Sequence, residues 1–162
     1  MVVGVVSNTE GRLEAMEAAA QTLRALGVEW IIHCGDVGGR HVLDAFRNAD
    51  VDAAFVWGDQ DRDRMGLLRY AQKEQIQCFG VLADLEIDGK RIAVVHGDDK
   101  KVLKRLLDEQ QYDFIFHGHG HASEDKMVGR TRLVHPGSLY GAPKRTAGVV
   151  DLSTNDVKLL EI

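Results

Sequence analysis

The stretch Phe114–His121 reads FIFHGHGH and places three histidines at alternate positions directly after an apolar run. Successive side chains of a β-strand point to opposite faces, so we expect His117, His119 and His121 to share one side where the strand ends. Neutral imidazole is the commonest metal ligand among protein side chains. The stretch therefore predicts a metal site at the end of a buried strand. The alternative is a histidine-rich loop tip that binds no ligand.

Polar side chains also follow the apolar runs that lie upstream of this stretch. In folds with parallel sheets, ligands bind beyond the carboxyl ends of the strands, so these residues are expected to converge on one site. They are Asn8 and Glu10 after the first run, Asp36 after the second, Asp59 after the third and His96 after a hairpin.

Strands and helices alternate in the first half of the chain. Val2–Val6 is a β-branched run typical of a strand covered on both faces, and the apolar spacing within 12–26 predicts a helix that ends at Gly27. This alternation predicts right-handed crossovers and a parallel sheet. The further expected elements are strands at 30–33 and 53–57, a short helix at 41–48 and a helix that contains Met65, Leu67, Leu68 and Ala71.

The pattern changes after Cys78, where an antiparallel half is expected. The segment 82–87 alternates, and Asp88-Gly89 is a strong turn signal into a second strand at 90–95. The simplest architecture is a single α/β domain over residues 1–162, with two β-sheets packed face to face as a sandwich and flanked by helices. The later expected elements are a helix at 102–110 and strands at 114–116, 126–128, 131–135, 147–152 and 157–162.

Charge and composition restrict the partners of the chain. A net charge of -5 and a pI near 5.8 argue against binding to nucleic acid or to an anionic membrane, so we expect a small-molecule partner. No apolar run is long enough to span a bilayer, and no signal-peptide pattern follows Met1. Cys34 and Cys78 near the ends of apolar runs suit a reducing compartment, which predicts a cytoplasmic location. The sequence leaves a homo-oligomer open.

Six short segments, in order along essentially the whole chain, resemble the calcineurin-like metallophosphoesterases. The likeness is to the YfcE/Vps29-like family, which includes small bacterial and archaeal phosphodiesterases and the retromer subunit of the Vps29 type. Each segment alone is weak evidence for the resemblance, whereas six segments in the family's order are strong evidence. They are Asn8-Thr9-Glu10, Gly35-Asp36, Gly58-Asp59, His96-Gly97, Gly118-His119-Gly120-His121 and His135-Pro136-Gly137-Ser138.

The resemblance implies two divalent metal ions and names their ligands. Asp36 would bridge the ions, and a hydroxide activated by both would attack phosphorus in line. The implied activity is a metal-dependent phosphodiesterase that hydrolyses a small phosphate ester, with Asp36, Asp59 and His96 as catalytic residues. The alternative is a degenerate, Vps29-like binding or scaffold module. The implied ligands are Asn8, Glu10, Asp36 and His121 for metal one, and Asp36, Asp59, His96 and His119 for metal two.

Three of these positions depart from the family pattern. Asn8 replaces an aspartate and Glu10 a histidine, so we interpret them as a charge-compensated pair; the alternative for Glu10 is that it only begins a helix. Asp59 replaces a neutral asparagine and makes the donors harder. This favours Mn²⁺, Fe²⁺ or Mg²⁺ over Zn²⁺, with Mn²⁺ the first candidate and Ni²⁺ and Zn²⁺ as alternatives.

Other residues near these segments have further expected roles. Gln60 stands where larger phosphatases carry a histidine and cannot act as a general acid, so poor leaving groups should react slowly. Asp61 is expected to be a helix N-cap. Asp98 stands where many relatives have a second histidine. His117 and His135 either donate hydrogen bonds that orient the ligands or are packing residues. Lys144 and Arg145 either contact a phosphate or form a solvated surface pair.

Overall fold

Strand β1 (Val2–Val6) lies in the middle of the first sheet, as its run of buried β-branched residues predicts. The computed structural model describes residues 1–162. The first sheet has the strand order β11-β10-β1-β2-β3-β4, in which β1, β2 and β3 are parallel neighbours. Its other strands are β2 (Trp30–His33), β3 (Asp52–Phe55), β4 (Gln77–Cys78), β10 (Thr146–Asp151) and β11 (Asp156–Glu161).

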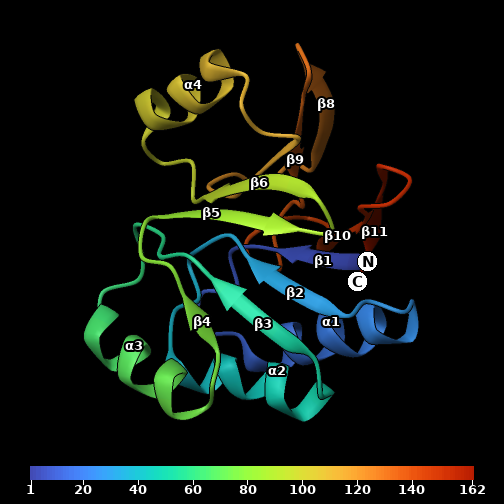
Figure 1. The fold of residues 1–162 in the computed structure, drawn as a ribbon. Coiled ribbons are helices and arrows are strands. Elements are labelled where there is room, and N and C mark those ends of the chain that lie inside the picture. Colours follow the sequence, from blue (N-terminus) through green and yellow to red (C-terminus); the bar gives the residue numbers. More distant parts are fainter.

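The second sheet faces the first and has the order β5-β6-β7-β9-β8 (Figure 1). The expectation of a wholly antiparallel second half is wrong, because β7 is parallel to both β6 and β9. A helix connects β6 to β7, and such a crossover returns the chain in the same direction. The strands of this sheet are β5 (Leu82–Ile87), β6 (Lys90–Val95), β7 (Phe114–His117), β8 (Glu124–Val128) and β9 (Thr131–His135).

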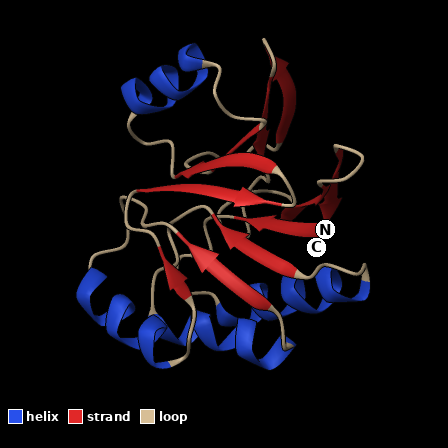
Figure 2. Cartoon of the chain, in the orientation of Figure 1, coloured by secondary structure: helices blue, strands red, loops and turns tan.

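Helices cover the outer faces of both sheets (Figure 2). Three α-helices lie against the first sheet and α4 lies against the second (Figure 1). The predicted helix at 41–48 is a 3-10 turn (Arg40–Leu43) that leads into α2, and α4 starts earlier than predicted because Asp99 caps it. The α-helices are α1 (Leu13–Ala25), α2 (Asp44–Ala49), α3 (Arg64–Lys73) and α4 (Lys100–Glu109).

The core has three layers that follow from this arrangement. A cluster of 21 buried residues fills the space between the first sheet and its helices, and one of 14 lies between the two sheets. A small cluster of 6 residues joins α4 to the second sheet. The largest buried side chains between the sheets include Phe114 and Phe116, so the strand that leads to the histidines is anchored in the centre of the molecule. None of the helices has the length and apolar character needed to cross a membrane.

Candidate metal centre

All seven predicted ligands lie beyond the carboxyl ends of strands. The parallel strands β1, β2 and β3 of the first sheet and β6 and β7 of the second direct these ends toward one side of the sandwich. The sequence places the polar residues in the loops that follow, so the fold itself gathers them. The loops follow β1 (Asn8, Glu10), β2 (Asp36), β3 (Asp59), β6 (His96) and β7 (His119, His121).

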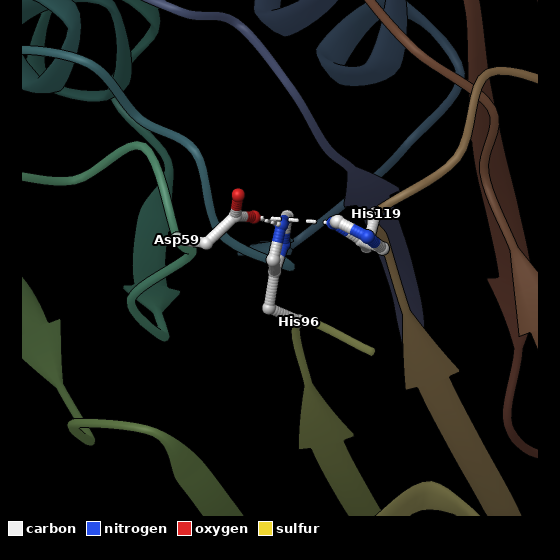
Figure 3. A group of neighbouring side chains, drawn as sticks. All are labelled: Asp59, His96 and His119. Atoms are coloured by element: carbon white, nitrogen blue, oxygen red, sulfur yellow. Dashed lines mark hydrogen bonds and ion pairs between the residues drawn. The ribbon is translucent and has the colours of Figure 1, made fainter. Parts of the chain in front are cut away.

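Three of these residues already form a cluster that could hold a metal ion. One ligand atom from each of Asp59, His96 and His119 lies within 4.8 Å of the other two (Figure 3). His96 Nε2 is 2.9 Å and His119 Nδ1 is 3.1 Å from the same oxygen, Asp59 Oδ1. A second carboxylate oxygen, Asp36 Oδ2, is 3.2 Å from His96 Nε2. The structure therefore brings together the four ligands predicted for metal two.

His96 tests whether this cluster fits a cation. Its Nδ1–H donates to Cys34 O at 2.8 Å, which directs Nε2 toward Asp36 and Asp59. Burial by itself lowers the pKa of His96. The hydrogen bond to Asp36 and the charges of the nearby carboxylates outweigh this effect and raise the pKa to about 9. A buried imidazolium thus occupies a position where two carboxylates attract positive charge. A neutral imidazole with Nε2 free is a good ligand for a divalent ion, so the donor set fits one.

Asp36, the predicted bridging residue, is held from both sides. Its Oδ1 accepts the backbone N–H of Gln60 at 2.9 Å, and its other oxygen faces His96. The side chain of Gln60 donates to Asp59 Oδ2 at 2.8 Å. Burial raises the pKa of Asp59, but the Gln60 hydrogen bond and the neighbouring histidines lower it overall. Hydrogen bonds from Gln60 thus orient both carboxylates.

The residues predicted for metal one are less closely gathered. Asn8 is buried; its Oδ1 accepts the Ser7 hydroxyl at 2.7 Å and its Nδ2 donates to Gly120 O at 2.8 Å. Glu10 is exposed, and burial of part of its carboxyl together with the charge of Asp36 raises its pKa. Glu10 is not in the first turn of α1, which starts at Leu13. The assignment of metal one remains a prediction.

The three histidines of the quoted stretch do not share one side. Strand β7 ends at His117, and His119 has a positive φ of 59°, which breaks the alternation. His117 packs edge-on against His135, with ring centroids 4.8 Å apart, and neither Nε2 has a hydrogen-bond partner. His121 lies against Gly141 instead. The prediction of a shared side is wrong, because it assumed that the strand continued.

Four of the predicted ligands have a left-handed backbone. A positive φ is uncommon for residues other than glycine, and such strain concentrates at functional sites. These residues lie in three different loops, so each of those loops bends sharply next to a predicted ligand. They are Asn8 (54°), Glu10 (45°), Asp36 (59°) and His119 (59°).

Asp61 braces these loops, a role that sequence reasoning missed. The N-cap of α3 is Asp63, which accepts the backbone N–H of Gly66, so the N-cap prediction for Asp61 is wrong. Asp61 is buried and accepts three backbone N–H groups, from Asp36 (3.0 Å), Gly38 (2.8 Å) and Gly58 (2.8 Å). Its signal in the sequence was the run Asp59-x-Asp61-x-Asp63, in which only one residue can be the cap.

A buried histidine outside the predicted set joins two of the loops. Gly35 N–H donates to His33 Nδ1 at 3.2 Å, which leaves Nε2–H to donate to Thr9 Oγ1 at 2.9 Å. Burial lowers the pKa of His33 to about 3, so the ring is neutral. The only sign of this role in the sequence was the position of His33 at the end of the predicted strand 30–33. A histidine at such a position can equally be a metal ligand or a residue that links loops by hydrogen bonds.

The two residues of the surface pair Lys144-Arg145 differ in their partners. Lys144 pairs with Glu161 at 2.9 Å, as a solvated surface residue would, whereas Arg145 has no carboxylate partner. Arg145 lines a pocket beside the loop that follows β1. Asp98 is exposed and lines a different pocket, next to His96.

Comparison with known proteins gives one consistent result. A family model described as the calcineurin-like phosphoesterase superfamily domain matches residues 1–155. The phosphodiesterase MJ0936 of Methanocaldococcus jannaschii is 27% identical over 163 residues, which cover 98% of this chain and 97% of that protein.

Solved structures show the same fold. A structure described as a novel archaeal phosphodiesterase matches with a TM-score of 0.93 and 24% identity over 100% of both chains. Vps29 of Entamoeba histolytica, solved in complex with zinc, matches with a TM-score of 0.64 and 18% identity over 100% of this chain and 98% of that one. At these identities the likeness concerns the fold alone.

Proposed function

The chain belongs to the calcineurin-like phosphoesterase superfamily and is thereby a hydrolase of phosphate esters, and from this premise we propose that it is a metal-dependent phosphodiesterase that acts on a small phosphate ester. The observation that carries the proposal is the cluster of Asp59, His96 and His119, beside which Asp36 Oδ2 lies 3.2 Å from His96 Nε2. Two carboxylates and two imidazoles in this arrangement suit Mn²⁺, the first candidate.

Each residue of this set has a definite task in the proposed reaction. Asp36, Asp59, His96 and His119 would hold one divalent ion, and Asn8, Glu10 and His121 would complete a second site around Asp36. Divalent ions in such a site stabilise charge on phosphoryl oxygens and lower the pKa of water. The Cys34 carbonyl fixes the orientation of His96, and the Gln60 N–H fixes that of Asp36.

Gln60 sets the expected choice among phosphate esters. Its amide nitrogen donates to Asp59 and carries no acidic proton for a leaving group. Esters whose leaving group departs without protonation should therefore react fastest. This favours activated diesters over alkyl monoesters.

Hydrolysis of bis(p-nitrophenyl) phosphate in Mn²⁺ tests the proposal. We expect turnover in the native protein and a loss of about a hundredfold or more in Asp36→Ala, because removal of a ligand costs more than the roughly 10 to 100-fold typical of groups behind ligands. The diester should also react faster than an alkyl phosphate monoester. Equal rates in native protein and Asp36→Ala would disprove the assignment.

One observation favours a second candidate, a binding or scaffold module. Both polar atoms of the Asn8 side chain make hydrogen bonds within the protein, and Glu10 stands apart from the cluster. A protein that binds Mn²⁺ by isothermal titration but hydrolyses neither the diester nor the monoester would support this candidate.

A further inference from the structure

The arginines of this chain divide into two groups by their partners. Six form ion pairs with carboxylates, and the other six have no carboxylate oxygen within 4.0 Å. An arginine without a counter-ion is a ready donor for an anionic ligand. The paired ones are Arg24, Arg47, Arg91, Arg105, Arg130 and Arg132. The unpaired ones are Arg12, Arg40, Arg62, Arg64, Arg69 and Arg145.

Five of the six unpaired arginines line pockets next to the loops of the candidate metal centre, and one of them, Arg64, lies in the pocket that contains His96. Arg12 and Arg145 line one pocket, and Arg40 and Arg62 line another. The two pockets adjoin at His41, which lines both of them. Unpaired arginines on a chain of net charge -5 are thus concentrated around the one site where an anionic ester would react.

The Arg12–Arg145 pocket is the one better suited to an anion. It has a volume of about 480 Å³, and the Arg12 guanidinium lies 4.7 Å from the centre of the Tyr140 ring. Glu14 is its single carboxylate, and it is exposed. The Arg40–Arg62 pocket contains two carboxylates, Asp61 and Asp63, which offset its arginines.

This pocket adjoins the residues predicted for metal one. Gly11, in its lining, directly follows Glu10. Tyr140, also in the lining, precedes Gly141, and a Cβ atom on Gly141 would lie 3.0 Å from His121 Cε1. A substrate whose ester group lies at the metal centre can therefore extend into the pocket. The acidic centre itself repels a second anion, whereas the pocket attracts one.

We propose that the Arg12–Arg145 pocket binds a second phosphate group of the substrate, so that the substrate is a phosphodiester that carries a further phosphate. This inference rests on the proposed function, which supplies the reacting ester. The arginines would act as specificity determinants. They would contact the part of the substrate that does not react, and so would lower KM more than they raise kcat.

Two activated diesters test the proposal directly. One is thymidine 5′-(p-nitrophenyl phosphate), and the other is the same compound with a 3′-phosphate. In Mn²⁺ at low salt, the 3′-phosphate should lower KM about tenfold and leave kcat within about twofold, as expected for a charge-assisted contact made equally in ground and transition states. The KM difference should shrink with added NaCl, because these arginines are exposed.

Variants locate the effect. The double variant Arg12→Gln/Arg145→Gln should lose most of the KM difference while it still hydrolyses the compound without the 3′-phosphate. Arg69→Gln is the matched control, because Arg69 is also unpaired but lies on α3 and lines none of these pockets. It should keep the full difference. Loss of the difference in Arg69→Gln, or in Arg40→Gln/Arg62→Gln alone, would overturn the assignment.

Binding without turnover separates the two hypotheses. Isothermal titration with thymidine 3′,5′-bisphosphate and with thymidine 5′-phosphate should show tighter binding of the bisphosphate in native protein, and a smaller preference in Arg12→Gln/Arg145→Gln. Failure to hydrolyse either diester would reject the proposed function, whereas equal affinity for both nucleotides would reject this inference whether or not turnover occurs.

Discussion

Asn8 shows how one atom can determine which residue a site tolerates. Its amide nitrogen donates to the carbonyl of Gly120 and ties the loop after β1 to the histidine loop after β7. The aspartate of the family pattern would place a carboxylate oxygen against that carbonyl. The departure at this position therefore has a structural cause in addition to the charge compensation with Glu10 that the sequence indicated.

The variant Asn8→Asp should destabilise the protein in EDTA by about 1 to 3 kcal/mol, the range for loss of one partner of a buried hydrogen bond. Added Mn²⁺ should recover part of this loss, because a bound cation would neutralise the new carboxylate. Urea unfolding with and without Mn²⁺ measures both effects. Asn155→Asp is the control, since Asn155 also has a positive φ but is exposed. Equal losses in the two variants would contradict the role of the Gly120 contact.

The sequence predicted the candidate site best where a ligand follows directly from a buried strand. Asp36, Asp59 and His96 each lie in the loop after such a strand, and in the structure the two carboxylates lie 3.2 Å and 2.9 Å from His96 Nε2. The prediction failed where backbone conformation determines the direction of a side chain. His119 is the example, because its left-handed φ cannot be seen in the pattern of side chains. The sequence also could not assign the cap between Asp61 and Asp63, because that choice depends on contacts with distant loops.

At the scale of elements, the loops after β2 and β3 approach so closely that one of them must contain a glycine. A Cβ atom on Gly58 would lie 2.0 Å from Asp36 Oδ1 and 2.4 Å from Asp36 N. Any other residue there would displace the carboxylate that Gln60 and His96 hold in place. The close approach of these two loops therefore fixes the position of Asp36.

Gly58→Ala should therefore weaken Mn²⁺ binding about tenfold or more and destabilise the protein by about 1 to 3 kcal/mol, as overpacking does. Isothermal titration and urea unfolding measure the two effects. Gly148→Ala is the matched control, because its Cβ would meet its nearest neighbour, Val5 Cβ, at an ordinary 3.5 Å. If Gly58→Ala binds Mn²⁺ as Gly148→Ala does, the loops can separate without loss of the site.

Some strands with a clear alternation were predicted to the residue, whereas the bounds of α1, β8, β10 and β11 differ from the prediction by one or two residues. The hairpin of β5 and β6 and the strand β9 have the expected bounds, since alternation and the Asp88-Gly89 turn define them. Strand β4 was missed because it has only two residues, Gln77 and Cys78, and its pairing with β3 depends on tertiary contact. Parallel pairing in the second sheet was missed because it depends on how α4 returns the chain.

At the scale of the whole molecule, buried neutral histidines couple stability to pH. Burial lowers the pKa of His33 to about 3 and that of His135 to about 4. Both values lie below the unfolded value of about 6.5, so the unfolded chain takes up these protons first as the pH falls. The stabilisation is complete above that unfolded pKa and is lost progressively below it. His96, whose pKa is raised to about 9, acts in the opposite direction.

The His33→Asn variant isolates one of these terms. Asparagine can accept the Gly35 N–H but cannot titrate. The free energy of unfolding of the variant should therefore fall less between pH 7 and pH 5 than that of the native protein. The difference from the native protein should be about 2 kcal/mol, the linkage expected for one histidine over this interval. Urea unfolding in EDTA at both pH values measures it. Parallel pH dependence in the two proteins would show that His33 is protonated in the fold.

The pairing of β1 with β10 fixes the order in which the molecule can be completed. Strand β1 is the first element of the chain, yet one of its edges pairs with residues 148–151, and Leu139 N–H binds the Ser7 carbonyl next to Asn8. During synthesis that edge stays open until the C-terminal hairpin emerges, and such long-range pairing is slow to form. We therefore expect the loop that carries Asn8 and Glu10 to reach its final place among the last events of folding.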